Sequence, residues 1–143
     1  MLKEKWDYKK VIKFFYSLKR FELLKKEAEK AAKAVLKGIR KKGTVEIYFV
    51  KDEEMAEINK ASRGKRGPTN ILSFEAKGKF PRPDLKEPFL GEIYVAPDYS
   101  KRKEDELKLL IIHGVLHLLG FDHKTEKEAS LMEKKEDLFL SKI

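Results

Sequence analysis

The sequence predicts an α+β fold, in which about four strands form a mixed sheet and four to five helices pack against it. Two observations lead to this prediction. Segments with the alternating pattern of strands and segments with the spacing of amphipathic helices both occur, and they do not alternate strictly along the chain. Apolar residues make up 41% of the 143 residues, so the chain can bury a core. We therefore expect a single domain over residues 1–143.

The first half should contain an edge strand, a long helix, an inner strand and a short helix, and we place these at residues 11–16, 21–40, 44–50 and 53–61. The edge strand is a run of β-branched and aromatic residues. Apolar residues recur on one face of the long helix, which Lys42 and Gly43 should end. Asp52 should cap the short helix.

The second half begins with a basic turn and continues through a strand, a surface loop, a second strand and a helix, which we place at 63–68, 70–75, 77–89, 91–96 and 103–119. Pro97 and Asp98 should start a loop between the last strand and that helix. Gly120 should end the helix in a left-handed conformation. Thr125 should cap the final helix, with Glu128 completing a capping box.

The net charge of +9 comes from the N-terminal part of the chain. Residues 1–43 contain 15 Lys plus Arg and 5 Asp plus Glu, a local net charge of +10. A polyanionic partner such as RNA is one interpretation. A heat-adapted surface is the other, because the chain has no Gln, only two Asn and many Lys and Glu. Both interpretations stay open.

Composition and patterning also exclude several classes of protein. With no Cys, the chain has no disulfide, thiol nucleophile or Cys-based metal site. The first ten residues lack the apolar core of a signal peptide, and the longest apolar run, 109–121, is too short to cross a bilayer. We therefore expect a soluble cytoplasmic protein that does not bind membranes.

All three histidines lie within eleven residues, at His113, His117 and His123. Residues four apart on a helix lie on one face, so the imidazoles of His113 and His117 should converge. A turn at Gly120 should return His123 to the same place. Three imidazoles suit Zn²⁺ and leave its fourth position open, as in catalytic sites. Nickel or another divalent metal would also accept these ligands.

The spacing of the histidines equals that of the metzincin metalloproteases, H-E-x-x-H-x-x-G-x-x-H, with one difference. Gly114 stands where those enzymes have the glutamate that acts as general base. A metzincin-like metallopeptidase is therefore an alternative function, although it would lack the usual general base. Asp122 could orient a ligand imidazole or could bond only to the local backbone.

Three sequence blocks resemble the YbeY family of bacterial RNA-processing endoribonucleases. They are HGVLHLLGFDH at 113–123, NKASRGKRGPTNILSF at 59–74 and LGEI at 90–93. The order and spacing agree with the family from about 44 to 140, the part that contains the motifs of a metal-dependent hydrolase. Ser62, Arg66 and Glu92 depart from the family pattern, and none of them is a candidate metal ligand.

The resemblance implies a metal-dependent, single-strand-specific endoribonuclease that acts in ribosomal RNA maturation, including the 3′ end of 16S rRNA, and in ribosome quality control. It implies a Zn²⁺-like ion on the three histidines and a role in activity for Arg63. The implied partner is single-stranded RNA, as ribosomal RNA or within a ribosomal subunit. A non-catalytic zinc-containing RNA-binding factor in ribosome assembly is a further alternative.

Residue chemistry agrees in part with this function. The guanidinium of Arg63 can grip a phosphate oxygen, and Lys65 and Arg66 can hold neighbouring phosphates. Asn70 can orient a phosphate or a loop carbonyl. No separate general base stands out, although His113 or His117 could take that role if the metal were held loosely. For the three cations the competing interpretation is a solvated basic turn.

Overall fold

The computed structural model describes residues 11–76 and 82–143, and its centre is a four-stranded mixed sheet. The strands are β1 (Ile12–Tyr16), β2 (Thr44–Phe49), β3 (Ile71–Glu75) and β4 (Phe89–Val95). Their order is β1-β2-β4-β3; the first three in this order are parallel, and β3 runs antiparallel to β4. The α+β prediction and the edge position of the first strand are confirmed. Residues 77–81 of the expected loop lie outside the described residues.

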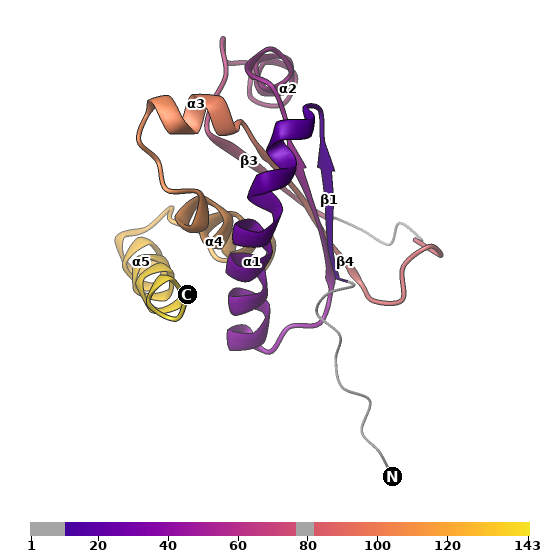
Figure 1. Cartoon of the computed structure of the whole chain (residues 1–143). Helices are drawn as coiled ribbons and strands as arrows, with labels where there is room; N and C mark the ends of the chain where they lie inside the picture. The colour runs from indigo at the N-terminus through magenta and orange to yellow at the C-terminus, as the bar shows by residue number, and fades with distance from the viewer. Residues whose placement is uncertain (1–10, 77–81) are drawn as a thin grey trace.

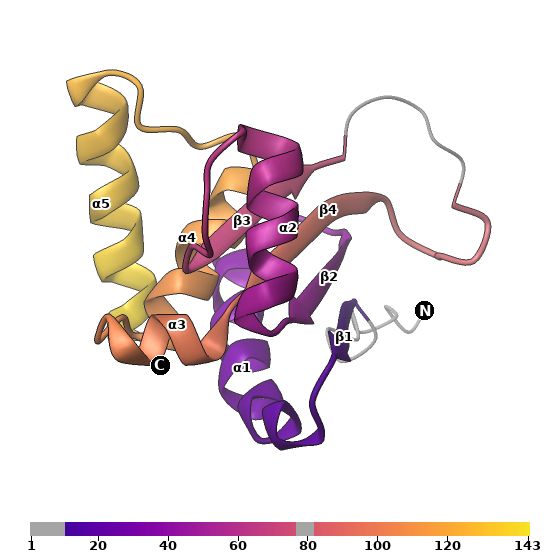
Figure 2. The same ribbon diagram turned by 90° about the horizontal axis from the view of Figure 1, so that it is seen from above.

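The helices lie mainly on one face of this sheet. They are α1 (Lys25–Ile39), α2 (Asp52–Arg63), α3 (Pro97–Arg102), α4 (Leu107–Leu118) and α5 (Glu126–Ser141), and a short 3-10 helix (Lys19–Leu24) precedes α1. Figure 1 shows α1 and α4 packed together beside the sheet, with α5 on their outer side. Figure 2 shows α2 and α3 near the ends of the strands that precede them. The His-bearing helix α4 therefore lies between the sheet and α5.

The main core fills the space between the sheet and these helices. Alternate residues of β2 and β4 face it, because side chains on a strand point to opposite faces in turn. Its fully buried members include Ile47, Phe49, Ile93, Ile112 and Leu116. Strand β3 and α4 are in direct contact, so the histidines of α4 lie next to the edge of the sheet.

The opposite face of the sheet is more polar and is covered in part by α2. Met55 of α2 is fully buried in a small second cluster with Leu72 and Ala96. The rings of Tyr48 and Tyr94, on neighbouring strands, stack with their centroids 4.6 Å apart. Burial raises the pKa of the Tyr48 hydroxyl to about 12, with a further contribution from the charge of Glu46.

Some of the expected boundaries are wrong. Pro97 and Asp98, which were expected in a loop, begin the short helix α3, because the fixed φ of proline suits the first helical position. The helix expected over 103–119 is α4 alone, and it begins only at Leu107. Glu104 then takes a left-handed φ of 58°, which reverses the chain before α4. The residue preceding α2 is Lys51 rather than Asp52, and the side chain of Asp52 instead forms an ion pair with Arg102.

Among the described residues, no helix combines the length and the apolar character needed to cross a membrane.

Candidate metal centre

Helix α4 brings His113 and His117 together at its C-terminal end. The helix is almost entirely buried on the sides that face β3, β4 and α1, and the two imidazoles lie on its partly exposed side. Their Nε2 atoms are 3.0 Å apart and the ring centroids 4.5 Å apart. Two nitrogen ligands of one tetrahedral Zn²⁺ would be roughly 3.3 Å apart, given bonds of about 2.0–2.1 Å. The pair therefore has the spacing of two ligands to one ion.

A glycine turn after α4 brings the third imidazole to the same place. The N–H of Gly120 donates to the carbonyl of His117 and that of Phe121 to the carbonyl of Leu116, both at 3.0 Å, which is the Schellman arrangement. Gly120 has a φ of 95°, as the sequence predicted. The ring centroid of His123 lies 5.1 Å from that of His117.

The three histidines together form a candidate metal site. One nitrogen from each ring lies within 4.8 Å of the others, and this is the one such cluster of metal-binding side chains among the described residues. Three neutral imidazoles are a donor set that Zn²⁺ and related divalent ions accept. The geometry therefore fits a resident metal ion with room for a further ligand.

Asp122 lies in the same turn and bonds to the local backbone. Its carboxylate accepts a hydrogen bond from the backbone N–H of His123 at 2.7 Å, and this bond lowers the pKa of the carboxyl group. Of the two roles open from the sequence, the structure supports the local backbone role. Asp122 thus fixes the main chain at His123.

The local environment keeps His117 in its neutral form. Burial lowers the pKa of its imidazole, and the nearby rings of His113 and His123 lower it further. A neutral imidazole has a free nitrogen lone pair, which is the form that binds a metal. Burial and the neighbouring rings therefore favour the form of His117 that has a lone pair available for a metal ion.

Glu136 is a site residue that the sequence analysis missed. It lies on α5, and its Oε1 atom is 2.9 Å from Nδ1 of His113. The glutamate side chain is only 17% exposed. The signal was present in the sequence, because Glu136 lies four residues after Met132 and three before Phe139 and so shares the buried face of α5. A charged residue on an apolar helix face needs a partner, and His113 is that partner.

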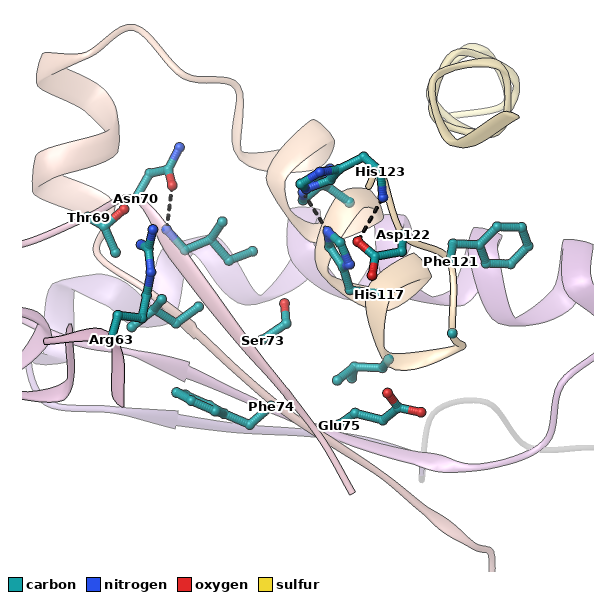
Figure 3. A pocket seen from close by; sticks show the side chains of 15 residues that line it. Arg63, Thr69, Asn70, Ser73, Phe74, Glu75, His117, Phe121, Asp122 and His123 are labelled. Carbon is teal, nitrogen blue, oxygen red and sulfur yellow. Dashed lines mark hydrogen bonds between the residues drawn. The ribbon is translucent and has the colours of Figure 1, made fainter. Parts of the chain in front are cut away.

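A pocket of about 850 Å³ lies between β3 and the histidines. Figure 3 shows the imidazoles on one side, Ser73 of β3 across from them, and Arg63 beside Thr69 and Asn70 where β3 begins. Arg63 is the last residue of α2, and it is exposed. The pocket therefore brings the three candidate metal ligands and Arg63 together on a single concave surface.

The turn after Arg63 is attached to α2 by a buried amide. Asn59 is 3% exposed, and its Nδ2 donates to the carbonyl of Gly67 at 2.9 Å. Lys65 and Arg66, within this turn, are exposed and do not line the pocket. Asn70 lines the pocket, but its amide bonds to the backbone N–H of Ile71 at 2.7 Å and to Asp105 at 3.2 Å.

One wall of the pocket is the unpaired edge of β3. Hydrogen bonds of 3.0 Å join β3 to β4 at both of its ends, from Ala96 N–H to the carbonyl of Asn70 and from Ala76 N–H to that of Leu90. In an antiparallel ladder, bonded and outward-facing residues alternate. The main-chain N–H of Ser73 therefore points away from β4, toward the pocket side of the strand.

Comparison with protein families shows the family to which this chain belongs. The family model described as endoribonuclease YbeY matches residues 15–143. The chain belongs to the YbeY family. It is 38% identical over 128 residues to an endoribonuclease YbeY of Bartonella henselae, covering 80% of this chain and 79% of that protein. It is also 38% identical over 108 residues to one of Francisella tularensis subspecies novicida, covering 69% and 67% respectively.

A solved structure is similar to the chain in fold and, to a lesser degree, in sequence. The solution structure of a protein from Thermotoga maritima superposes with a TM-score of 0.56 at 28% sequence identity, covering 90% of this chain and 85% of the other. The family model and the curated relatives confirm the resemblance stated from the sequence blocks, and the match extends over more of the chain than the 44–140 segment that suggested it.

One departure from the YbeY family pattern lies away from the metal site. Glu92 stands in the LGEI block, and its side chain accepts a hydrogen bond of 2.5 Å from the hydroxyl of Tyr94. Glu92 does not line the pocket, and the next residue, Ile93, faces the main core beside α4. Because strand side chains alternate in direction, Glu92 lies on the opposite face of the sheet from the histidines.

The position of Gly114 explains why a YbeY protein has no glutamate beside its first histidine. A Cβ atom there would lie 3.0 Å from Cδ1 of Ile71, 3.1 Å from Cδ1 of Ile93 and 3.1 Å from Oγ of Ser73. The helix face at residue 114 therefore packs directly on the sheet. A larger side chain has no room, so the general base of the metzincin proteases has no counterpart in this position.

Proposed function

We propose that the protein is a zinc-dependent endoribonuclease that cuts single-stranded RNA during ribosomal RNA maturation, including the 3′ end of 16S rRNA, and in ribosome quality control. Membership of the YbeY family makes it an endoribonuclease, with RNA as its substrate. The zinc ion, the strand preference and the ribosomal target are the proposed part. Because ribosomal RNA is processed where ribosomes assemble, we place the activity in the cytoplasm.

The convergence of three imidazole nitrogens in one pocket is the observation that supports this function best. We assign His113 and His117, through Nε2, and His123 as the metal ligands. A zinc ion bound there would supply a water of near-neutral pKa and would polarise a phosphoryl oxygen. His113 and His117 thus take part in catalysis as ligands, and neither is proposed as general base.

Arg63 is proposed to clamp the phosphate that is cut. Its guanidinium group lines the same pocket as the imidazoles and is held at the end of α2. A planar, permanently charged fork suits two oxygens of one phosphate. Lys65 and Arg66, on the exposed turn outside the pocket, are proposed to contact the flanking phosphates.

Asn70 is proposed to contact RNA only indirectly. Both ends of its amide are already engaged, with Ile71 and Asp105. Its effect on RNA would therefore be to fix the start of β3 and the pocket wall there. The outward N–H of Ser73 on that wall is a main-chain donor of the kind that holds phosphates and base edges.

The shape of the site favours single strands. A pocket of about 850 Å³ takes a segment the size of a small-molecule ligand. The scissile phosphate has to reach the imidazoles inside this concavity. A single strand can bend into such a site, whereas the bases of an RNA duplex are stacked within a rigid helix.

The first experiment measures metal content and RNA cleavage in parallel. Purified wild type should contain about one zinc per chain and cut single-stranded RNA faster than a duplex of the same sequence. His117→Ala should lose the metal and the activity, because it removes one of only three ligands. Lys127→Ala, an exposed change in the first turn of α5, is the matched control. Equal and negligible metal in wild type and His117→Ala would overturn the proposal.

A second comparison tests the phosphate clamp. Arg63→Ala should lower kcat/KM for RNA by about 100-fold, as expected when a charged hydrogen bond to the reacting phosphate is lost. Lys60→Ala, one turn earlier on the exposed side of α2, should leave kcat/KM unchanged. Metal content should be the same in both variants, which separates the clamp from the metal site.

The two alternative functions, a metallopeptidase and a non-catalytic RNA-binding factor, each predict results that differ from those expected for an endoribonuclease. A metallopeptidase would cleave casein in a chelator-sensitive reaction and leave RNA intact, and the packing of Gly114 against β3 argues against it. A non-catalytic RNA-binding factor would bind RNA but show no loss of RNase activity in His113→Ala. Structural zinc sites are normally closed by four protein ligands, and three converge here among residues 11–76 and 82–143.

A further inference from the structure

Glu136 and His113 form a contact between two helices that the proposed reaction does not itself require. The carboxylate is on α5 and the imidazole on α4, 23 residues apart in sequence. The Oε1 to Nδ1 distance of 2.9 Å is that of a hydrogen bond. Both side chains are mostly shielded from water, at 17% and 32% exposure. A glutamate is rarely placed so deep without a function for its charge.

The contact gives the two ring nitrogens of His113 different roles: Nδ1 bonds to Glu136, and Nε2 is left for a metal ion. Nδ1 faces the Glu136 carboxylate, which can only accept a hydrogen bond, so Nδ1 must carry the proton. Nε2 faces Nε2 of His117 at 3.0 Å, in the direction where the ligand nitrogens converge. With the proton on Nδ1, the lone pair of Nε2 is free to bind a cation.

We propose that Glu136 is a positioning residue, which holds His113 in the Nδ1–H tautomer and at the ring angle that presents Nε2 to the metal. The inference rests on the proposed metal site and adds a residue from the last helix to it. In this arrangement both nitrogens of His113 are occupied, so His113 cannot act as a general base. The carboxylate also balances part of the charge that a bound cation would bring into the site.

The packing of α5 makes this contact rigid. Met132 and Phe139, on the same face of the helix as Glu136, are each 1% exposed in the main core. Phe139 lies against Gly38 of α1 so closely that a Cβ atom there would fall 2.1 Å from its ring. Because α5 is anchored on both sides of Glu136, the carboxylate has a fixed place from which to orient the imidazole.

The tautomer can be measured directly on the metal-free protein. The chain has only three histidines, so a long-range ¹H–¹⁵N spectrum of the imidazoles contains three ring patterns, which single His→Ala variants assign. In wild type, His113 should show a protonated Nδ1 and an unprotonated Nε2. In Glu136→Ala the proton should redistribute toward Nε2, the nitrogen that carries it in most free neutral histidine. A His113 pattern that is the same in both proteins would overturn the proposal.

Metal affinity is the second measurement. Competition with a chelating dye should give a Zn²⁺ Kd that is about 10–100-fold weaker for Glu136→Ala, the usual effect of removing such a partner. Glu136→Gln retains an acceptor oxygen without the charge, so its Kd should lie between those of wild type and Glu136→Ala. Glu133→Ala, on the exposed side of α5, should bind like wild type. Unchanged Kd values in both Glu136 variants would overturn the proposal.

The outcomes separate this inference from the function it rests on. If wild type binds zinc and Glu136→Ala binds it equally well, Glu136 has no positioning role and the metal site stands. If wild type binds no zinc, the metal site and the positioning role both fail. If Glu136→Ala loses affinity only because α5 detaches, its urea unfolding transition will shift and Glu136→Gln will not rescue binding, which also overturns the role.

Discussion

At the scale of single residues, the site depends on two glycines, one that allows close packing and one that allows a left-handed turn. Gly114 lets α4 lie directly on β3, and Gly120 lets the chain turn back so that His123 joins the other imidazoles. Neither glycine has any chemistry of its own. The one sequence block that contains the histidines is therefore constrained by backbone geometry as well as by ligand identity.

Introducing a glutamate at residue 114 should damage the fold without creating a peptidase. Gly114→Glu forces Cβ within 3.0–3.1 Å of Ile71, Ile93 and Ser73 and places a charge against the core. We expect the free energy of unfolding to fall by at least about 2 kcal/mol, from overpacking and burial of a charge. Urea unfolding measures the loss, and Gly114→Ala should show a smaller one. Wild-type stability together with casein cleavage would contradict this account.

The left-handed conformation of Gly120 gives a graded prediction. Gly120→Ala must hold a side chain at a φ of 95°, which costs about 1–2 kcal/mol of stability. Gly120→Asn should cost less, because asparagine tolerates this region better than alanine. No atom lies within 4 Å of the added Cβ, so crowding does not contribute. The Tm from thermal unfolding should be highest for wild type, lower for Gly120→Asn and lowest for Gly120→Ala.

At the scale of elements, the sequence predicted the strands and long helices well and the short connections poorly. The alternation in 44–50 and the apolar face of 21–40 locate β2 and α1, because burial on one face leaves a periodic pattern. The break between α3 and α4 depends on Glu104, which adopts a left-handed conformation that is uncommon for its residue type. Such a break has no local sequence signal.

The same contrast applies to the site. The three histidines were predicted to meet because they are close in sequence and their spacing is helical. The position of Glu136 on the buried face of α5 could be read from the sequence, but its partner could not, because the contact with His113 depends on how α5 packs against α4. Contacts between distant elements need the fold to be known.

An ion pair joins the segment before α1 to α3 and should contribute to stability in a pH-dependent way. Arg20 donates two hydrogen bonds to the carboxylate of Asp98, at 2.8 and 2.6 Å, and these lower the pKa of that carboxyl group. The contribution is therefore present above the unfolded-state pKa, about 3.9, and is lost as the pH falls through the lower folded-state pKa.

Replacing this carboxylate tests the contribution. Asp98→Asn should unfold at a slightly lower urea concentration than wild type at pH 7, because exposed pairs contribute little. The difference should disappear at a pH below the folded-state pKa, where Asp98 is protonated in both states. Glu133→Gln, an exposed carboxylate on α5, is the control. A difference that persists unchanged in acid would show that the ion pair is not its cause.

At the scale of the whole molecule, the lysines of α1, which are part of the N-terminal charge surplus, lie away from the pocket. Lys26, Lys30 and Lys33 line a surface hollow with Lys108, and Glu27 and Glu29 line it too. Lys108 is near the start of α4 and His117 near its end, about 14 Å apart along the helix axis. The RNA contacts that we propose use the few cations beside the pocket, and the α1 lysines are not among them.

Salt dependence of RNA binding distinguishes these two surfaces. Three phosphate contacts, from Arg63, Lys65 and Arg66, predict a slope of about −2 for log affinity against log salt on single-stranded RNA. Arg63→Ala should make the slope shallower by about 0.7. The double change Lys26→Gln with Lys30→Gln should leave the slope unchanged, as measured by fluorescence anisotropy. If the slope instead becomes shallower in the double variant, the RNA binds along α1.

The closeness of the three imidazoles along the chain has a consequence for folding. His113, His117 and His123 come from a single eleven-residue segment, whereas Arg63 and Glu136 reach the site only through tertiary packing. An unfolded or newly synthesised chain therefore keeps all three ligands within reach of one ion. Metal that binds the unfolded chain reduces the net stabilisation that the ion gives to the native state. The ion can thus be captured before the sheet has formed, and folding then adds the arginine and the glutamate around it.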